Sequence, residues 1–304
     1  MQITDIQIDK NHREKTIHGS YDFPIAIYLD QLDKNVLGFV SWHWHDEIQL
    51  SLVNKGEVEF SVNQGVHVLK EGQGIFINSG CLHMSRPVSK LDSTYICINV
   101  DTKMLSFFQG SIIEQKYIKP FLKLPSFSYV VLANEKDWQK TVLKKIQEIF
   151  SLYAQKPFGY ELNICIELAA IWMQLIARQS DIIPSENTEE YIDQQRIKKI
   201  MSYIHEHYSE KITLQEIASV VNISKGECCR FFKRVVKCTI FEYVMNYRIN
   251  RSIELLKTTD MTISNIANLV GFGSTSYYIE SFKKQVLCSP KEYRKRSIMF
   301  AEHN

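Results

Sequence analysis

The chain has 304 residues, of which 45% are hydrophobic, 23% charged and 12% aromatic. This is the composition of a globular protein with apolar material for two modest cores, and it excludes disordered, collagenous and low-complexity classes. No run of 18 or more uncharged apolar residues occurs, so we expect a cytoplasmic protein with neither a membrane span nor a secretory signal. The seven cysteines form no C-x-x-C pair and are expected to be reduced thiols, mostly in the core.

The net charge is +2 for the whole chain, but its two parts carry net charges of opposite sign. Residues 191–304 hold 18 Lys and Arg against 11 Asp and Glu, a surplus of seven positive charges, and the remainder has a surplus of five negative charges. A basic domain joined to an acidic one is typical of a nucleic-acid-binding module with a separate sensing or catalytic module.

Short segments of alternating polarity fill residues 20–100. Residues 58–62, 66–68 and 95–100 alternate apolar with polar side chains, and glycines separate these segments at turn-like intervals. The pattern predicts an antiparallel sandwich or barrel.

From Trp138 the apolar period becomes helical, and it continues beyond Pro157-Phe158-Gly159 to Ile176. This predicts a helical hairpin with a broad apolar face. Polar residues and a proline then interrupt the period, which favours a linker. The predicted domains are a barrel over residues 1–136, a hairpin over 137–180 that we expect to dimerise, a linker over 181–195, and a helical domain over 196–304.

The helical domain repeats itself at an interval of 49 or 50 residues, which indicates a tandem duplication. The recurring pairs are Ile217-Ala218 with Ile266-Ala267, Phe232-Lys233-Arg234 with Phe282-Lys283-Lys284, and Cys238-Thr239 with Cys288-Ser289. Four capping boxes, Thr213 to Glu216, Ser224 to Glu227, Thr239 to Glu242 and Ser289 to Glu292, predict helices that start near residues 214, 225, 240 and 290.

In each repeat a small alanine is followed four residues later by Asn222 or Gly271. These two residue types tolerate the left-handed backbone of a sharp turn. Helix, tight turn, helix is the plan of the helix-turn-helix, whose second helix enters the DNA major groove. A generic helical bundle also contains such turns, but two in tandem with a basic surplus favour DNA binding. The second helices are predicted over 225–235 and 275–286, and a helix over 241–256 would hold them about one DNA turn (~34 Å) apart.

The second repeat contains a specific motif: Ala267-x-x-Val270-Gly271-Phe272-x-Ser274-x-Ser276-Tyr277, then Ser281-Phe282-Lys283-Lys284 and Ser289-Pro290-x-x-Tyr293-Arg294. It resembles the signature of the AraC/XylS family of bacterial transcriptional regulators, over about residues 190–297. The resemblance implies two helix-turn-helix motifs in successive major-groove segments of asymmetric DNA. The residues expected to contact DNA are Lys225, Gly226, Cys229, Arg230, Lys233, Arg234, Ser274, Thr275, Ser276, Glu280, Lys283 and Lys284.

These residues differ in their expected roles. Arg230 is the best candidate for contact with a guanine, whereas Lys233 and Lys283 suit phosphates, which position the protein without specifying sequence. Glu280 could accept from a cytosine amine or be a solvated charge. The sequence departs from the family at Lys237 and Leu287, where glycine is usual.

The adjacent Cys228 and Cys229 would face about 100° apart on a helix. One thiol is therefore expected in the core and the other toward the groove. A redox switch is the less favoured interpretation, because no thiolate-stabilising partner is evident.

Three histidines mark the predicted barrel. His43 and His45 would face one side of a strand, with Gln49 if that strand continues, and His83 could complete a three-histidine cluster. The spacing resembles the two motifs of a cupin β-barrel, with Gln49 in place of the usual carboxylate ligand and Ser79 in place of a proline. Three imidazoles could still hold zinc, but the missing carboxylate leads us to expect no metal and no other cofactor. His43, His45, Gln49 and His83 are predicted to line an effector pocket, or else to be merely packed.

The sequence therefore predicts an α+β protein of two domains, a cupin-like antiparallel β-barrel with a helical hairpin followed by an all-α double helix-turn-helix. We expect a sequence-specific transcriptional regulator, not an enzyme, controlled by a small-molecule effector such as a sugar. The expected partners are double-stranded DNA, the effector, a second copy of the chain and RNA polymerase, and no membrane. Two alternatives stay open: a metal-dependent cupin enzyme, and a regulator that needs no effector.

Overall fold

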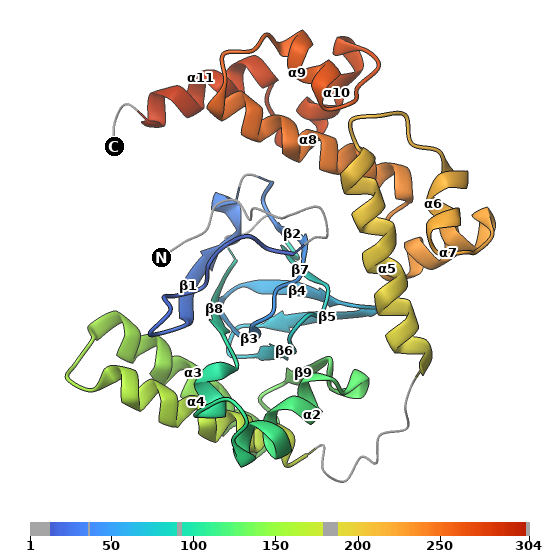
Figure 1. Cartoon of the computed structure of the whole chain (residues 1–304). Helices are drawn as coiled ribbons and strands as arrows, with labels where there is room; N and C mark the ends of the chain where they lie inside the picture. Colours follow the sequence, from blue (N-terminus) through green and yellow to red (C-terminus); the bar gives the residue numbers. More distant parts are fainter. Residues whose placement is uncertain (1–12, 36, 90–92, 179–187, 302–304) are drawn as a thin grey trace. The chain divides into compact units, whose positions relative to one another are not determined.

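The computed structural model describes residues 13–35, 37–89, 93–178 and 188–301. The chain forms two compact units that divide between Gln194 and Gln195. The first unit is built on two β-sheets and the described part of the second is helical (Figure 1), which confirms the predicted fold class. No helix in the described part of the chain combines the length and apolar character needed to cross a membrane.

The first unit contains two antiparallel sheets. Their strands are β1 (Ile25–Gln31), β2 (Val40–His43), β3 (Ile48–Lys55), β4 (Glu57–Val62), β5 (Gly65–Lys70), β6 (Gly74–Ile77), β7 (His83–Pro87), β8 (Thr94–Val100) and β9 (Tyr129–Leu132). The five-stranded sheet has the order β1-β8-β3-β6-β9 and the four-stranded sheet the order β2-β7-β4-β5. The three segments predicted as strands from their alternating polarity lie in β4, β5 and β8.

Side-chain alternation along the five-stranded sheet supplies two separate cores. Val53 and Cys97 belong to a cluster that also contains Phe60 of the opposite sheet, so they fill the space between the sheets. Leu50 and Ile98 belong to another cluster, which covers the outer face of the same sheet.

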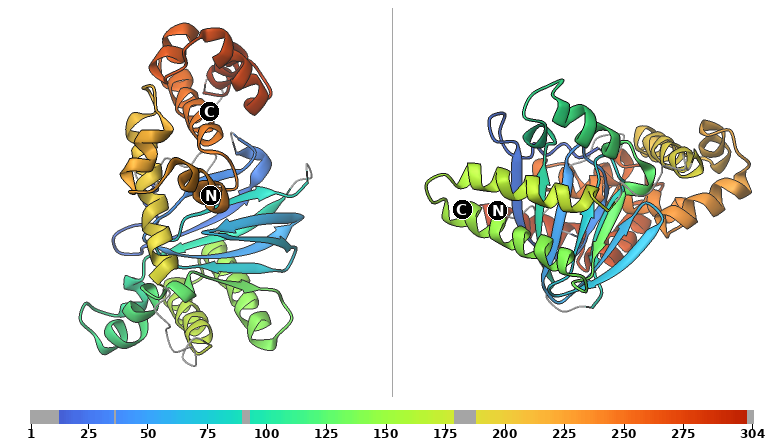
Figure 2. Two further views of the ribbon diagram at one scale, coloured as in Figure 1. Left: turned by 90° about the vertical axis from the view of Figure 1, so that its right-hand side faces the viewer. Right: turned by 90° about the horizontal axis from the view of Figure 1, so that it is seen from below.

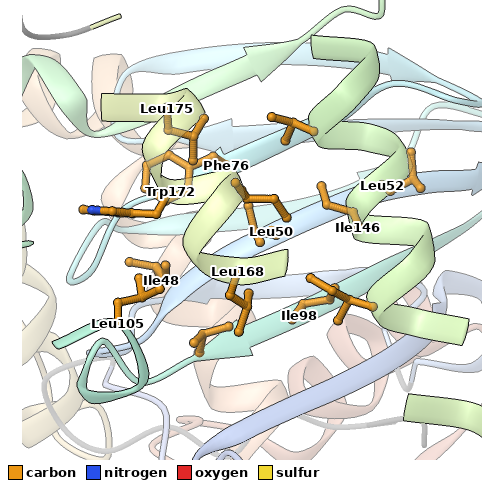
Figure 3. Close-up of a cluster of buried hydrophobic side chains, with 14 of the residues drawn as sticks. Ile48, Leu50, Leu52, Phe76, Ile98, Leu105, Ile146, Leu168, Trp172 and Leu175 are labelled. Carbon is orange, nitrogen blue, oxygen red and sulfur yellow. The ribbon is translucent and has the colours of Figure 1, made fainter. Parts of the chain in front are cut away.

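Helices α3 (Asp137–Gln155) and α4 (Tyr160–Ile176) form the predicted hairpin and cover this outer face (Figure 2). Figure 3 shows Ile146, Leu168 and Trp172 over Leu50 and Ile98. The dimer was predicted from the broad apolar face of this hairpin. The structure shows that this face of the hairpin packs on the chain's own sheet. The unit also contains α1 (Lys103–Ser106), a π-helical turn at Glu114–Ile118, α2 (Lys119–Leu122), and two 3-10 turns at Leu32–Lys34 and Pro125–Phe127.

Seven helices make up the described part of the second unit, the first of which begins seven residues before the division between the units. They are α5 (Thr188–His207), α6 (Leu214–Val220), α7 (Lys225–Val236), α8 (Ile240–Thr258), α9 (Ile263–Leu269), α10 (Thr275–Val286) and α11 (Pro290–Ala301). The predicted linker, 181–195, overlaps α5 from Thr188 onward, because the polar residues there still form a helix; residues 181–187 lie outside the described residues.

Local capping fixes where these helices begin. The helices predicted near residues 214, 225, 240 and 290 start at those residues. Thr213 and Thr239 form complete capping boxes with the glutamates three residues on, and Ser289 does the same with Glu292. At α7 the Ser224 hydroxyl accepts from the amide of Glu227.

The two helix-turn-helix turns have the predicted geometry. Asn222 and Gly271 have φ of +53° and +86°, in the left-handed region. A Cβ on Gly271 would lie 2.6 Å from the carbonyl oxygen of Tyr208, so only glycine fits there. Helix α8 contacts α7 of the first motif and both α9 and α10 of the second, and it therefore connects the two motifs.

Leu287 follows α10 with φ of +62° and is 88% exposed. A side chain with a Cβ is strained in this conformation by roughly 1–2 kcal/mol, whereas glycine is not. We expect Leu287→Gly to raise the free energy of unfolding by about 1 kcal/mol, measured by urea unfolding of the full chain. Leu287→Ala is the control, because it removes the exposed side chain but keeps the strain; equal stability of the two variants would contradict the explanation.

Candidate functional site

Helix α7 exposes the side on which the sequence placed DNA contacts. Lys225, Gly226, Cys229, Arg230 and Lys233 are exposed. The opposite side packs into the domain through Cys228, Phe231, Phe232, Val235 and Val236. The prediction that one of the adjacent cysteines is buried and the other exposed is confirmed. No packing within the domain covers the predicted reading face among the described residues.

Two arginines of α7 have different neighbours. A Cβ on Gly226 would lie 3.4 Å from Nη1 of Arg230, so the Arg230 guanidinium lies close beside this glycine on the exposed side. The Arg234 guanidinium lies 5.6 Å from the centre of the Phe231 ring, a cation–π distance. Arg234 is exposed as Arg230 is, so it stays a predicted DNA contact, with its guanidinium near the Phe231 ring, whereas that of Arg230 lies beside Gly226.

Helix α10 presents a second exposed side that carries Ser276, Glu280, Lys283 and Lys284. The two other predicted contacts have structural partners. The Ser274 hydroxyl accepts from the amide of Tyr277 at 3.1 Å, and Thr275 is half-buried with Oγ1 3.1 Å from Oγ of Ser264.

Tyr277 is a further exposed side chain on α10 that was not among the predicted contacts. The sequence signal was its place between Ser276 and Tyr278, at the start of the second reading helix. Its aromatic ring offers apolar contact that no predicted residue of this helix supplies.

In the first unit, His43, His45 and His83 come together as predicted, and one ring nitrogen of each lies within 4.8 Å of the others. The strands that bring these side chains together differ from the prediction. β2 ends at His43 and β3 begins at Ile48, so His43, His45 and Gln49 do not share a strand. His43 faces His83 across the β2–β7 pair, and Gln49 reaches the cluster from the opposite sheet.

Backbone carbonyls orient all three imidazoles in the same way. The Nδ1 atoms of His43, His45 and His83 lie 2.7, 3.1 and 2.8 Å from the carbonyl oxygens of Ser41, Glu47 and Cys81. A carbonyl oxygen only accepts, so each Nδ1 carries the proton. Each neutral ring then keeps its lone pair on Nε2.

Gln49 lies between two of these lone pairs. Its Oε1 is 3.3 Å from Nε2 of His45 and 3.0 Å from Nε2 of His83. Its Nε2 donates to the Ser51 hydroxyl at 2.9 Å. Burial lowers the pKa of His43 to about 4 and that of His83 well below its ordinary value, so these imidazoles are neutral at pH 7.

Glu14 is the member of the cluster that sequence reasoning missed. Its side chain is 1% exposed, and Oε2 lies 3.2 Å from Nε2 of His18 and 3.8 Å from Nε2 of His43. Burial raises the pKa of Glu14, but the hydrogen bond from His18 and the neighbouring imidazoles outweigh burial and lower it to about 2. No sequence signal marked Glu14, since it lies outside the histidine motifs and outside any periodic segment.

The cluster surrounds little free space. Glu14, His43, Gln49 and His83 line a cavity of about 20 Å³, enough for one water molecule or one ion but not for a sugar. Glu14 and His45 also form part of the wall of a larger hollow of about 1370 Å³, together with residues from the segments 13–24 and 101–109. The four residues predicted as an effector pocket thus border a space of ligand size only through His45.

Comparison with known proteins agrees with this division of the chain. Residues 27–158 match the AraC-like ligand binding domain and residues 217–296 match a helix-turn-helix domain. The HTH-type transcriptional regulator YdeC of Bacillus subtilis is 36% identical over 288 residues, which cover 95% of this chain and 97% of that protein.

Two more distant relatives align over most of the chain. The HTH-type transcriptional activator RhaR of Mannheimia succiniciproducens is 24% identical and covers 84% of this chain and 87% of its own length. The Melibiose operon regulatory protein of Escherichia coli is 26% identical, with coverage of 84% and 83%.

The fold and the two exposed reading helices define a DNA-binding transcriptional regulator with an N-terminal ligand-binding domain. The chain belongs to the AraC family of transcriptional regulators.

Proposed function

We propose that this regulator reads a bipartite DNA site through α7 and α10, and that a small molecule bound in the first unit controls it. The observation that supports DNA reading is the pair of amphipathic helices whose exposed sides carry Lys225, Arg230 and Lys233 on one and Lys283 and Lys284 on the other. Helix α8 contacts both motifs and is about 28 Å long at 1.5 Å per residue. Such a span suits two helices in successive major-groove segments.

Selection from a random duplex pool with the full chain, at near-physiological salt, tests this proposal. We expect enrichment of a motif with two halves about one helical turn (~34 Å) apart. A pool without such a bipartite motif would contradict the assignment of α7 and α10 as paired reading helices.

We place the effector in the hollow beside the histidine cluster. Its wall carries Tyr21, Phe107 and Phe108, three aromatic side chains that are largely exposed, together with charged groups such as Asp101 and Lys103. Aromatic rings that can stack, next to groups that can hydrogen-bond, suit a saccharide or related metabolite. The name of the Melibiose operon regulatory protein connects that relative with a disaccharide and supports the same class here.

A ligand screen by thermal unfolding tests the effector site. We expect a saccharide at 100 times its Kd to stabilise the full chain by about 2.7 kcal/mol, and Phe108→Ala to remove most of that shift. Phe158→Ala is the matched control, because Phe158 is fully exposed at the turn between α3 and α4 and does not line the hollow. An equal loss of the shift in both variants would place the ligand elsewhere.

We propose that a second copy of the chain binds to α4. Leu162, Ile166 and Met173 are each more than half exposed, and with the half-buried Ala169 they recur at intervals of four, three and four residues. This is the spacing of a coiled-coil seam. The buried Leu168, Ile171 and Leu175 lie about 100° or more around the helix from each of these residues. Of the four, Ala169 also packs against the core beneath α4, so the three exposed side chains are the part of the seam that the sheet does not use.

We further propose that the chain regulates transcription without catalysing a reaction and acts through RNA polymerase. The names of the relatives as transcriptional regulators support this role. Transcription in vitro from a selected site, with and without the chain, is the direct measurement.

A further inference from the structure

We propose that the interior of the first unit holds a first-row divalent metal ion, bound by Nε2 of His43, His45 and His83 and by the carboxylate of Glu14. The sequence predicted no metal because Gln49 stands where a carboxylate ligand was expected. Glu14 supplies that carboxylate from outside the histidine motifs. The inference goes beyond the proposed function, because it assumes neither DNA binding nor an organic effector.

The orientation of the histidines is the first argument. Each Nδ1 donates to a backbone carbonyl, which fixes the ring and leaves the Nε2 lone pair for the cluster. Histidine ligands of metals characteristically donate their other ring nitrogen to such an acceptor. Three buried imidazoles with this arrangement form one face of a metal site.

The lone pairs that meet in the cluster are the second argument. As Gln49 stands, its Oε1 lies near the lone pairs of both His45 and His83, and three acceptors in contact repel one another unless a cation or a proton lies between them. Rotation of the amide would relieve these two contacts. It would still leave Nε2 of His43 facing the Glu14 carboxylate.

The third argument is the unsatisfied oxygen of Glu14. Its Oε1 is buried without a hydrogen-bond partner in the described part of the chain, and an unpartnered buried carboxylate oxygen is costly. Oε2 is held by Nε2 of His18, and the hydroxyl of Tyr28 lies 3.1 Å from Nδ1 of the same ring. The Tyr28–His18–Glu14 chain thus orients the carboxylate, as outer groups around metal ligands do.

The available space agrees with an ion. Three of the proposed ligands, Glu14, His43 and His83, line a cavity of about 20 Å³, and His45 borders the cluster from the side of the larger hollow. Donor atoms around tetrahedral zinc lie roughly 3.3 Å apart, from Zn–N bonds of about 2.0–2.1 Å, so the ring nitrogens, now within 4.8 Å of one another, would move closer together when the ion binds. Imidazole with carboxylate suits zinc and its neighbours more than magnesium or calcium.

The ion would hold the segment from Arg13 onward against the two sheets of the first unit. The Glu14 amide donates to the carbonyl of Trp44 at 2.8 Å, and Arg13 forms an ion pair with Asp46. The same segment, from Arg13 to Pro24, forms part of the wall of the large hollow. Metal binding at Glu14 therefore orders one side of that hollow.

Zinc binding to the full chain tests the site. The protein is stripped with a chelator, titrated with Zn²⁺ alone by calorimetry, and its metal content is measured after gel filtration. We expect one Zn²⁺ per chain, a Kd raised at least about 10-fold in Glu14→Gln and still more in His83→Gln, and no change in His67→Gln. His67 is the matched control, because it lies half-buried on β5 outside the cluster.

Hydrogen exchange distinguishes the loss of a metal ligand from a general loss of structure. In the wild type, Zn²⁺ should slow hydrogen exchange of the peptide that contains residues 13–18, and it should fail to do so in Glu14→Gln, whose circular dichroism without metal should match the wild type. If His83→Gln does not fold, Glu14→Gln decides alone. Absence of stoichiometric Zn²⁺ in the wild type, or binding that Glu14→Gln leaves unchanged, overturns the proposal.

Discussion

Arg230→Ala should weaken binding to the preferred DNA site by about 1–3 kcal/mol and relax the sequence requirement at one base position. Arg230 is exposed on α7, and its guanidinium lies beside Gly226, where no side chain intervenes. A guanidinium held in this way can make paired hydrogen bonds to one guanine. Fluorescence anisotropy with the selected duplex and with single-base variants of it measures both effects.

Lys283→Ala provides the comparison, because Lys283 is exposed at the equivalent position of Lys233 in the second motif. A lysine that neutralises one phosphate should weaken all sequences alike and lower the salt slope of binding by about one. Equal losses for Arg230→Ala on random and preferred DNA would contradict a base-reading role for Arg230.

The C-terminal unit could be predicted closely because its determinants are local. A capping box spans four residues, so the starts of α6, α7, α8 and α11 follow directly from the sequence. Asn222 and Gly271 mark turns whose backbone conformation few other residues adopt. Local signals did not show that Arg234 stacks on Phe231, since helical spacing leaves several rotamers open.

The histidine cluster of the first unit could be predicted only in part. The convergence of His43, His45 and His83 was predicted correctly, but from a single strand that the structure interrupts before Ile48. Gln49 and Glu14 join the cluster through long-range packing of separate segments. Contacts between distant segments have no periodic signature along the chain, so the carboxylate could not be found from spacing.

The surface of helix α4 could also be predicted only in part. The helical spacing of its apolar residues is visible in the sequence. The sequence does not show which of these residues pack on the sheet and which stay exposed, because both sets contribute to the same periodic pattern. Packing on the sheet uses Leu168 and its neighbours. Only the structure shows that Leu162, Ile166 and Met173 remain exposed.

Ile166→Glu should convert the full chain from dimer to monomer at micromolar concentration, with a dimer Kd raised at least about 100-fold. A glutamate at the centre of the seam would be an unpaired charge in an apolar contact, which costs several kcal/mol. Ile166 is already more than half exposed within one chain, so the monomer fold should be unchanged. Sedimentation equilibrium measures the dissociation constant, and circular dichroism checks the fold.

Asn163→Glu is the matched control, since it adds the same charge to an exposed position of α4 that lies about 100° from Leu162 and off the seam. This variant should remain a dimer. A wild-type chain that sediments as a monomer at micromolar concentration with and without DNA would rule out the seam. If Asn163→Glu dissociated as readily as Ile166→Glu, the charge of the whole helix, and not burial of Leu162, Ile166 and Met173, would govern association.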